Sequence, residues 1–234
     1  MKIVILTALG VGFSTILGGI LGFIFKSSLQ KFSSAIMGFA NGVMLSASIF
    51  GLIIPALECS LWISILGIFF GAIVIFIVGK FVPNIDSFSS LSPDVGKGVL
   101  LFVIAIAIHN LPEGIATGVA FGSEDLGQAL TVAIGIALQN LPEGMVIISP
   151  LLSLGFSKRK TFLIALFTGL SEIIGTFFGY FAIGISSAIL PIFLAFAGGC
   201  MLYVINDDML KGEKSSVFSL LFGFCLMIVF NALM

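Results

Sequence analysis

Long apolar runs, separated by short groups of charged residues, fill almost the whole of this 234-residue sequence. A helix that crosses the hydrocarbon core of a bilayer needs about 20 mainly apolar residues. The runs of suitable length are Ile3–Phe25, Ser33–Leu57, Leu61–Gly79, Gly98–Phe121, Gln128–Ser153, Thr161–Gly184, Ala188–Asn206 and Ser215–Leu233. The pattern predicts an all-α, polytopic membrane protein with eight transmembrane helices. Since little sequence remains between the runs, we treat residues 1–234 as a single transmembrane domain.

The composition supports a bilayer as the solvent of this chain. Hydrophobic residues make up 59% of the sequence and charged residues only 9%, whereas a soluble domain is about 25% charged. The net charge of -1 offers no basic surface for nucleic acid. We expect membrane lipid around the chain, no nucleic-acid partner and no prosthetic group. The three cysteines are far apart and form no C-x-x-C pair, which favours apolar packing over metal or redox chemistry.

The basic residues predict the orientation, because loops on the cytoplasmic side of a membrane are enriched in Lys and Arg. With eight spans, both termini lie on one side. Nine of the ten basic residues fall between spans on the opposite side: Lys26, Lys31, Lys80, Lys97, Lys158, Arg159, Lys160, Lys211 and Lys214. Lys2 is the single basic residue on the side of the termini. The sequence therefore predicts that both termini are outside.

An internal repeat links the fourth and fifth runs. The segment from Ile106 to Gly114 reads IAIHNLPEG, and the segment from Ile136 to Gly144 reads IALQNLPEG. The two runs are predicted to cross in opposite directions, so the repeat implies a pseudo-two-fold axis in the membrane plane, as in inverted-repeat transporters. Pro and Gly interrupt both copies, a feature that marks the binding site of such proteins. Each Pro also leaves one helical carbonyl without its usual partner, so we expect a kink in both spans.

The polar residues of the repeat are placed to meet one another. His109 and Glu113 are four residues apart and share a helix face, as do Gln139 and Glu143. Glu172 adds a third intramembrane acid in the sixth run. Counted at the helical rise from the inner basic residues, Glu113, Glu143 and Glu172 lie roughly 24, 22 and 18 Å deep. The three carboxylates can therefore meet near the middle of the membrane.

These acids need a compensating partner, and no Lys or Arg lies inside any predicted span. A carboxylate at the bilayer centre costs several kcal/mol unless it is paired, so these groups are either protonated or hold a cation. One imidazole, two amide oxygens and three carboxylates suit Zn, Fe, Mn or Co better than Ca or Mg. The candidate metal-binding residues are His109, Asn110, Glu113, Gln139, Asn140, Glu143 and Glu172. Glu58 is either an interfacial charge or a further ligand near the outer mouth.

In these motifs the sequence resembles the ZIP (Zrt/Irt-like) family of divalent metal transporters. The segment from His109 to Gly114 fits the family pattern H-N-x-P-E-G, and the segment from Gly169 to Glu172 is similar to the family's acidic motif in span six. The stretch from Phe39 to Leu45, followed by Pro55 and Glu58, resembles the family's second span. Gln139 stands where many members have His, which is typical of a GufA-type branch.

The resemblance implies a mechanism and a more detailed fold. It implies that spans one to three and six to eight are related by inversion around spans four and five, often in a homodimer. It implies a primary metal position at His109, Glu113, Gln139 and Glu143, and a second position at Asn110, Asn140 and Glu172, with Glu113 and Glu143 bridging the two. It also implies movement of Zn²⁺, or of Fe²⁺, Mn²⁺, Co²⁺ or Cd²⁺, into the cytoplasm across the cell membrane. In a Gram-negative bacterium this would be the inner membrane.

Other functions are compatible with fewer of these features. A passive cation or proton channel could use the same acids and is the alternative within transport. An intramembrane metalloprotease would need H-E-x-x-H or a comparable pair of His, but the chain has one His. A structural scaffold would not need three uncompensated acids. We therefore expect a transporter and not an enzyme.

The orientation can be tested directly. A tag at either terminus should react with a membrane-impermeant reagent in intact cells, because nine of the ten basic residues place the opposite loops inside. Accessibility of each tag before and after permeabilisation is the measurement. Tags that react only after permeabilisation would show that the orientation is reversed.

Overall fold

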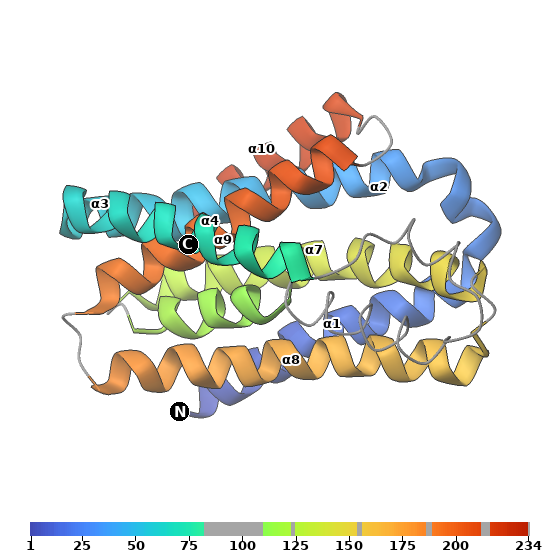
Figure 1. Ribbon diagram of the computed structural model, residues 1–234, viewed down its shortest axis with the longest axis horizontal. Helices are drawn as coiled ribbons and strands as arrows, with labels where there is room; N and C mark the ends of the chain where they lie inside the picture. Colours follow the sequence, from blue (N-terminus) through green and yellow to red (C-terminus); the bar gives the residue numbers. More distant parts are fainter. Residues whose placement is uncertain (82–109, 123–124, 154–155, 186–188, 212–215, 234) are drawn as a thin grey trace.

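The fold was analysed in a computed structural model, which describes residues 1–81, 110–122, 125–153, 156–185, 189–211 and 216–233. These residues form helices and no strand, so the predicted all-α fold is confirmed for them. The helices are α1 (Lys2–Ile24), α2 (Lys26–Ser46), η1 (Ala47–Ile53), α3 (Ile54–Cys59), α4 (Leu61–Phe81), α7 (Leu126–Ser153), α8 (Lys158–Ile185), α9 (Leu190–Lys211) and α10 (Val217–Leu233) (Figure 1). Residues 110–120 form a further helix.

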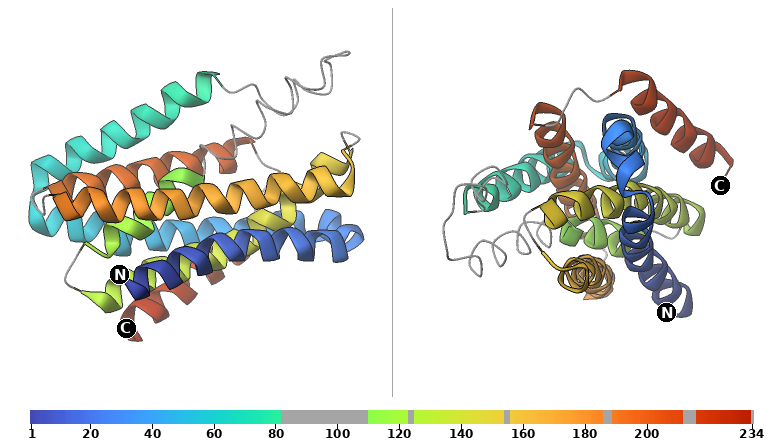
Figure 2. Two further views of the ribbon diagram at one scale, coloured as in Figure 1. Left: turned by 90° about the horizontal axis from the view of Figure 1, so that it is seen from below. Right: turned by 90° about the vertical axis from the view of Figure 1, so that its right-hand side faces the viewer.

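Four helical stretches among the described residues are long and apolar enough to cross a membrane: Lys2–Ile24, Ser34–Cys59, Leu61–Val78 and Lys158–Gly184. Shorter apolar helices cover Leu190–Asn206 and Val217–Leu233. The chain is thus a helical, polytopic membrane protein. Both termini lie at the same end of the bundle (Figures 1 and 2), as an even number of crossings requires.

The structure confirms one predicted boundary between helices, and several other helices begin or end at residues that differ from the prediction. The predicted tight turn between the second and third runs is present, because Ser60 is extended between the end of α3 at Cys59 and the start of α4 at Leu61. In contrast, α2 begins at Lys26 rather than Ser33, directly after Phe25. The helices α8 and α9 likewise include basic residues that were predicted to lie between spans. Lys and Arg are good helix formers whose long side chains can reach the interface from a helix end.

A π-helical segment, η1, interrupts the second span, and nothing in the apolar pattern predicted it. Its wide turns are shown by the N–H of Ile54, which donates to the carbonyl of Ile49 five residues earlier. Pro55, which has no N–H, follows at once. Within the segment, a Cβ added at Gly51 would lie 2.4 Å from the side chain of Val132 on α7. The segment therefore packs closely against α7.

The helix α7 lies at the centre of the described bundle. It contacts α1, α2, η1, α8 and α10, and the end-on view in Figure 2 shows it among these helices. The outer helices carry large exposed apolar side chains, such as Phe69 on α4, Phe178 on α8 and Phe222 on α10. Such side chains suit lipid. The polar side chains of α7, Gln139, Asn140 and Glu143, are tolerated because neighbouring helices separate them from the hydrocarbon.

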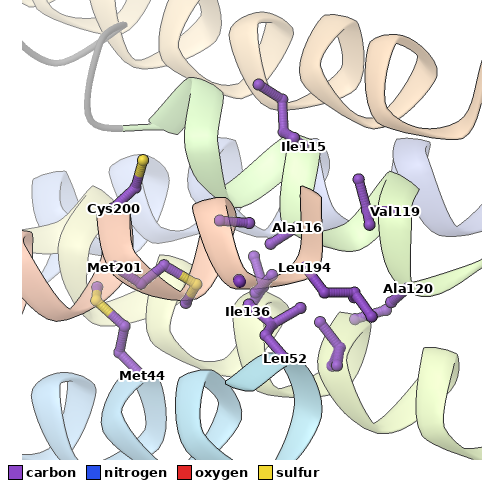
Figure 3. Close-up of a cluster of buried hydrophobic side chains, with 14 of the residues drawn as sticks. Met44, Leu52, Ile115, Ala116, Val119, Ala120, Ile136, Leu194, Cys200 and Met201 are labelled. Atoms are coloured by element: carbon purple, nitrogen blue, oxygen red, sulfur yellow. The ribbon is translucent and has the colours of Figure 1, made fainter. Parts of the chain in front are cut away.

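Two kinds of packing surround α7. On one side, a cluster of buried apolar residues from α2, η1, α7, α9 and residues 110–120 includes Met44, Leu52, Ile136 and Met201 (Figure 3). On the other side, α1 approaches α7 through glycine. A Cβ added at Gly18 would lie 2.3 Å from the carbonyl oxygen of Leu141. Small residues let helix backbones approach closely in membrane proteins.

This close approach generates a stability prediction. Gly18→Ala should lower the free energy of unfolding by about 1–3 kcal/mol, because the added methyl group forces the two backbones apart. The measurement is thermal unfolding in detergent. The matched control is Gly10→Ala on the same helix, since a Cβ there meets nothing within 4 Å. Equal melting temperatures for the two variants would contradict the packing described here.

Candidate metal site

The first buried polar pair joins the helix of residues 110–120 to α7. The Nε2 of Gln139 donates a 2.7 Å hydrogen bond to Oε1 of Glu113. Gln139 is fully buried and Glu113 is 2% exposed. Glu143 lies one helical turn beyond Gln139 on α7 and is also buried. The two copies of the sequence repeat are therefore in direct contact through their polar side chains.

A second polar cluster surrounds Glu172, which lies on α8 and is fully buried. Its Oε1 accepts hydrogen bonds from the hydroxyl of Thr15, at 2.6 Å, and from Nδ2 of Asn110. Its Oε2 accepts a 2.7 Å hydrogen bond from Nδ2 of Asn140. Four helical segments thus meet at one carboxylate. The structure brings Asn110, Asn140 and Glu172 together.

Two amide oxygens at this place have no hydrogen-bond partner among the described residues. They are Oε1 of Gln139 and Oδ1 of Asn140, and both are buried. Rotating either amide would place its oxygen against a carboxylate oxygen, so the hydrogen bonds fix the orientation of each amide. Leaving a buried acceptor unsatisfied costs free energy, about 1–3 kcal/mol. The two oxygens therefore fit the role of ligands to a cation.

Glycine and proline residues of the repeat shape the backbone around these groups. A Cβ added at Gly114 would lie 2.2 Å from the carbonyl oxygen of Glu172, and one added at Gly144 would lie 2.3 Å from that of Thr15. The absence of side chains at these positions lets α8 and α1 come close enough for short side chains to reach Glu172. The helix α7 continues through Pro142 and ends at Ser153.

The remaining predicted residues are placed as follows. His109 lies outside the described residues, next to Asn110 at the start of the described helix. Glu58 is exposed near the end of α3. Within the described part of the chain, no three side chains of His, Cys, Asp or Glu are grouped closely enough to hold a metal ion. Among the described residues, the polar groups that could contact a cation here are therefore amide oxygens as well as carboxylates.

The electrostatic setting favours a cation. Of the side chains that the structure describes as buried, none is Lys or Arg, whereas Glu113, Glu143 and Glu172 are all buried. Acids inside a membrane protein normally pair with cationic groups or mark an ion path. Carboxylate and amide oxygens of this kind are ligands that divalent cations use in proteins.

Sequence reasoning missed Thr15. Its hydroxyl donates to Glu172, although 157 positions separate the two residues. The available signal was weak: Thr15 lies midway between Gly12 and Gly18, a spacing that places all three on one face of the first span. A small-residue face of this kind indicates close helix packing, and it does not indicate which polar group it meets.

The sequence matches known transporters over most of its length. A family model described as ZIP zinc transporter matches residues 89–231. The zinc transporter ZupT of Streptococcus mutans is 31% identical over 231 residues, which cover 90% of this chain and 86% of that protein. The zinc transporter GufA of Myxococcus xanthus is 41% identical over 141 residues, or 58% of this chain and 56% of the relative. Human zinc transporter ZIP11 is 43% identical over 126 residues, or 51% and 37% of the two chains.

Proposed function

Because the chain belongs to the ZIP zinc transporter family, we propose that it moves Zn²⁺ and similar divalent ions across the cell membrane toward the cytoplasm. Members of this family are transporters, and we assign no enzymatic activity to the chain. The observation that carries the proposal is the pair of buried amide oxygens on Gln139 and Asn140, each fixed beside a carboxylate. These groups form a site for a cation where the structure describes no buried Lys or Arg.

The proposed primary position uses His109, Glu113, Gln139 and Glu143. Its support is the contact between Gln139 and Glu113, together with the position of Glu143 one turn along the same helix. The proposed second position uses Asn110, Asn140 and Glu172, which share hydrogen bonds. An ion moving between the two would pass along adjacent residues of α7. Sites that are close and individually weak allow an ion to leave as well as to enter.

The proposal includes the finer architecture expected for such a transporter. Eight helices cross the membrane, spans one to three and six to eight are related by inversion around spans four and five, and both termini are outside. The common end at which the termini lie supports an even number of crossings. A homodimer is part of this proposal. Its support is the resemblance to the family. The outer helices carry exposed apolar side chains that suit lipid or a second copy equally well.

Transport through this site can be tested with single substitutions. His109→Ala and Glu143→Ala should each reduce saturable Zn²⁺ flux into proteoliposomes at least about tenfold. Loss of a residue that only orients a metal ligand already costs about tenfold, and loss of the ligand itself should cost no less. Asn231→Ala, an exposed amide near the end of α10, is the control and should transport normally. Normal flux in both site variants, with correct insertion, would refute the site.

Gln139 allows a test of ligand strength. Imidazole is a better Zn²⁺ ligand than an amide oxygen, so Gln139→His should bind Zn²⁺ more tightly than the wild type. It should also turn over more slowly, since the ion must leave the site. Zn²⁺ titration of the detergent-solubilised protein, beside liposome flux, measures both effects. A variant that binds no more tightly would show that residue 139 does not contact the ion.

The proposed ligands also predict that Zn²⁺ affinity depends on pH. Carboxylate and imidazole ligands must lose their protons before they bind metal, so affinity should fall as pH falls. Gln139→His adds one group that must be deprotonated, whereas the amide it replaces does not titrate. The fall should therefore be steeper in the variant than in the wild type. Affinity that does not change with pH in either protein would contradict carboxylate and imidazole ligation.

A further inference from the structure

The helix α8 lies along one side of the bundle, and one of its faces is apolar and exposed (Figures 1 and 2). This exposed stripe consists of Leu163, Phe167, Leu170, Ile174 and Phe178, which follow one another at intervals of three or four residues. Each of the five side chains is at least 44% exposed. Because the hydrocarbon core is the surrounding solvent of a membrane helix, the exposed stripe faces acyl chains.

Two basic residues continue the exposed stripe at the start of α8. Arg159 lies four residues before Leu163 and Lys160 lies three residues before it, so both are on the same face of the helix as Leu163. Lys158 instead shares a face with Thr161, whose side chain is fully buried against the protein. All three basic residues are exposed. The exposed stripe therefore ends in two positive charges, while the third lies on another side of the helix.

These charges are concentrated where the helix does little to compensate them. The first turn of α8 contains no acidic residue. The unsatisfied N–H groups at the start of a helix also add partial positive charge, which makes cations unfavourable there. The hydroxyl of Ser157 accepts a hydrogen bond from one of these groups, the N–H of Lys160, at 3.4 Å. The basic side chains still lack a negative partner on their own turn, so an anion complements this end of α8.

The spacing along α8 matches the thickness of one leaflet. From Lys160 to Leu170 the helix rises about 15 Å, and half of the hydrocarbon core is also about 15 Å thick. Acyl chains below a headgroup at Lys160 would therefore cover the stripe from Leu163 to Leu170. Glu172 lies about 18 Å along the helix from Lys160, and it is fully buried. The exposed stripe is thus separate from the candidate metal site.

We propose that Arg159 and Lys160 bind the phosphate group of an anionic phospholipid whose acyl chains lie along the exposed stripe of α8. The planar guanidinium of Arg159 can donate two parallel hydrogen bonds to one phosphate, and the ammonium of Lys160 adds a compact charge. The apolar residues favour a lipid over a free phosphate, because only a lipid covers both the bases and the stripe. This interaction goes beyond the proposed transport function and does not depend on which residues hold the metal ion.

The test is binding of dioleoylphosphatidylglycerol to the delipidated full-length protein in neutral detergent. Native mass spectrometry measures the lipid-bound fraction at each lipid concentration. The wild type should bind this lipid more tightly than dioleoylphosphatidylcholine, which has the same acyl chains but no net charge. Lys160→Gln should weaken binding of the anionic lipid about fivefold, the effect of one basic residue near an anionic membrane surface. Equal binding of the two lipids by the wild type would overturn the proposal.

Lys158→Gln is the matched control, because it removes the same charge two positions away but off the exposed stripe. Gln is about as good a helix former as Lys, so both substitutions preserve the helix. Lys158→Gln should change the affinity for dioleoylphosphatidylglycerol less than about twofold. If it weakened binding as much as Lys160→Gln, the lipid would be responding only to the net charge of this end of the bundle, and the proposed surface would be wrong.

Two further measurements test the headgroup contact and the identity of the ligand. Arg159→Lys keeps the charge but loses the paired hydrogen bonds, so it should weaken binding, though less than Arg159→Gln. Wild-type affinity in Arg159→Gln would refute the phosphate contact. Inorganic phosphate should not displace the bound lipid, since it cannot cover the apolar residues. Displacement at concentrations comparable with those of the lipid would show a site for a free anion and would contradict the lipid assignment.

Discussion

A carboxylate inside a membrane helix bundle must be stabilised by the groups around it, and this requirement shapes the whole centre of the molecule. Glu172 receives three hydrogen bonds from three different helical segments. Glu113 receives one from Gln139. A hydrogen bond contributes about 0.5–1.5 kcal/mol net, and more when its acceptor is charged, which makes these contacts a large part of what holds the polar centre together. They also turn the amide oxygens of Gln139 and Asn140 away from the acids.

That polar centre depends on closely packed backbones. The side chains that reach Glu172 are short, so α1, α7, α8 and residues 110–120 must approach one another closely. Glycine makes this possible at Gly12, Gly18, Gly114 and Gly144, where any added Cβ would lie 2.5 Å or less from a neighbouring carbonyl oxygen. The two copies of the sequence repeat thus supply polar side chains of the site together with two of these glycines, Gly114 and Gly144.

Much of this arrangement could be predicted from the sequence. Apolar runs predicted the helices, and the turn at Ser60 was placed correctly. The repeat predicted that Asn110, Glu113, Gln139 and Asn140 would lie in two neighbouring helices, since intramembrane polar groups must find partners. The π-helical turns of η1 could not be predicted, because backbone hydrogen bonding there changes without a change in polarity. The helices begin earlier than predicted, at Lys26 and Lys158, because a basic residue at the end of a span can belong to the helix as well as to a loop.

The contact between Thr15 and Glu172 was beyond sequence reasoning for a different reason. A threonine in an apolar span has no charge and no motif, and its partner is determined by how three helices cross. Depth along the helices places Glu172 near the other acids, but depth does not show which side chains donate hydrogen bonds to its carboxylate.

The position of the bound ion tests the central claim most directly. Crystals of the protein grown with Zn²⁺, with diffraction recorded above and below the zinc absorption edge, would locate the ion by its anomalous signal. The account predicts a peak between residues 110–120 and α7, at coordination distance, about 2.0–2.2 Å, from oxygens of Glu113, Gln139 or Glu143. Zinc found only on the surface of the bundle, with no peak beside these residues, would contradict it.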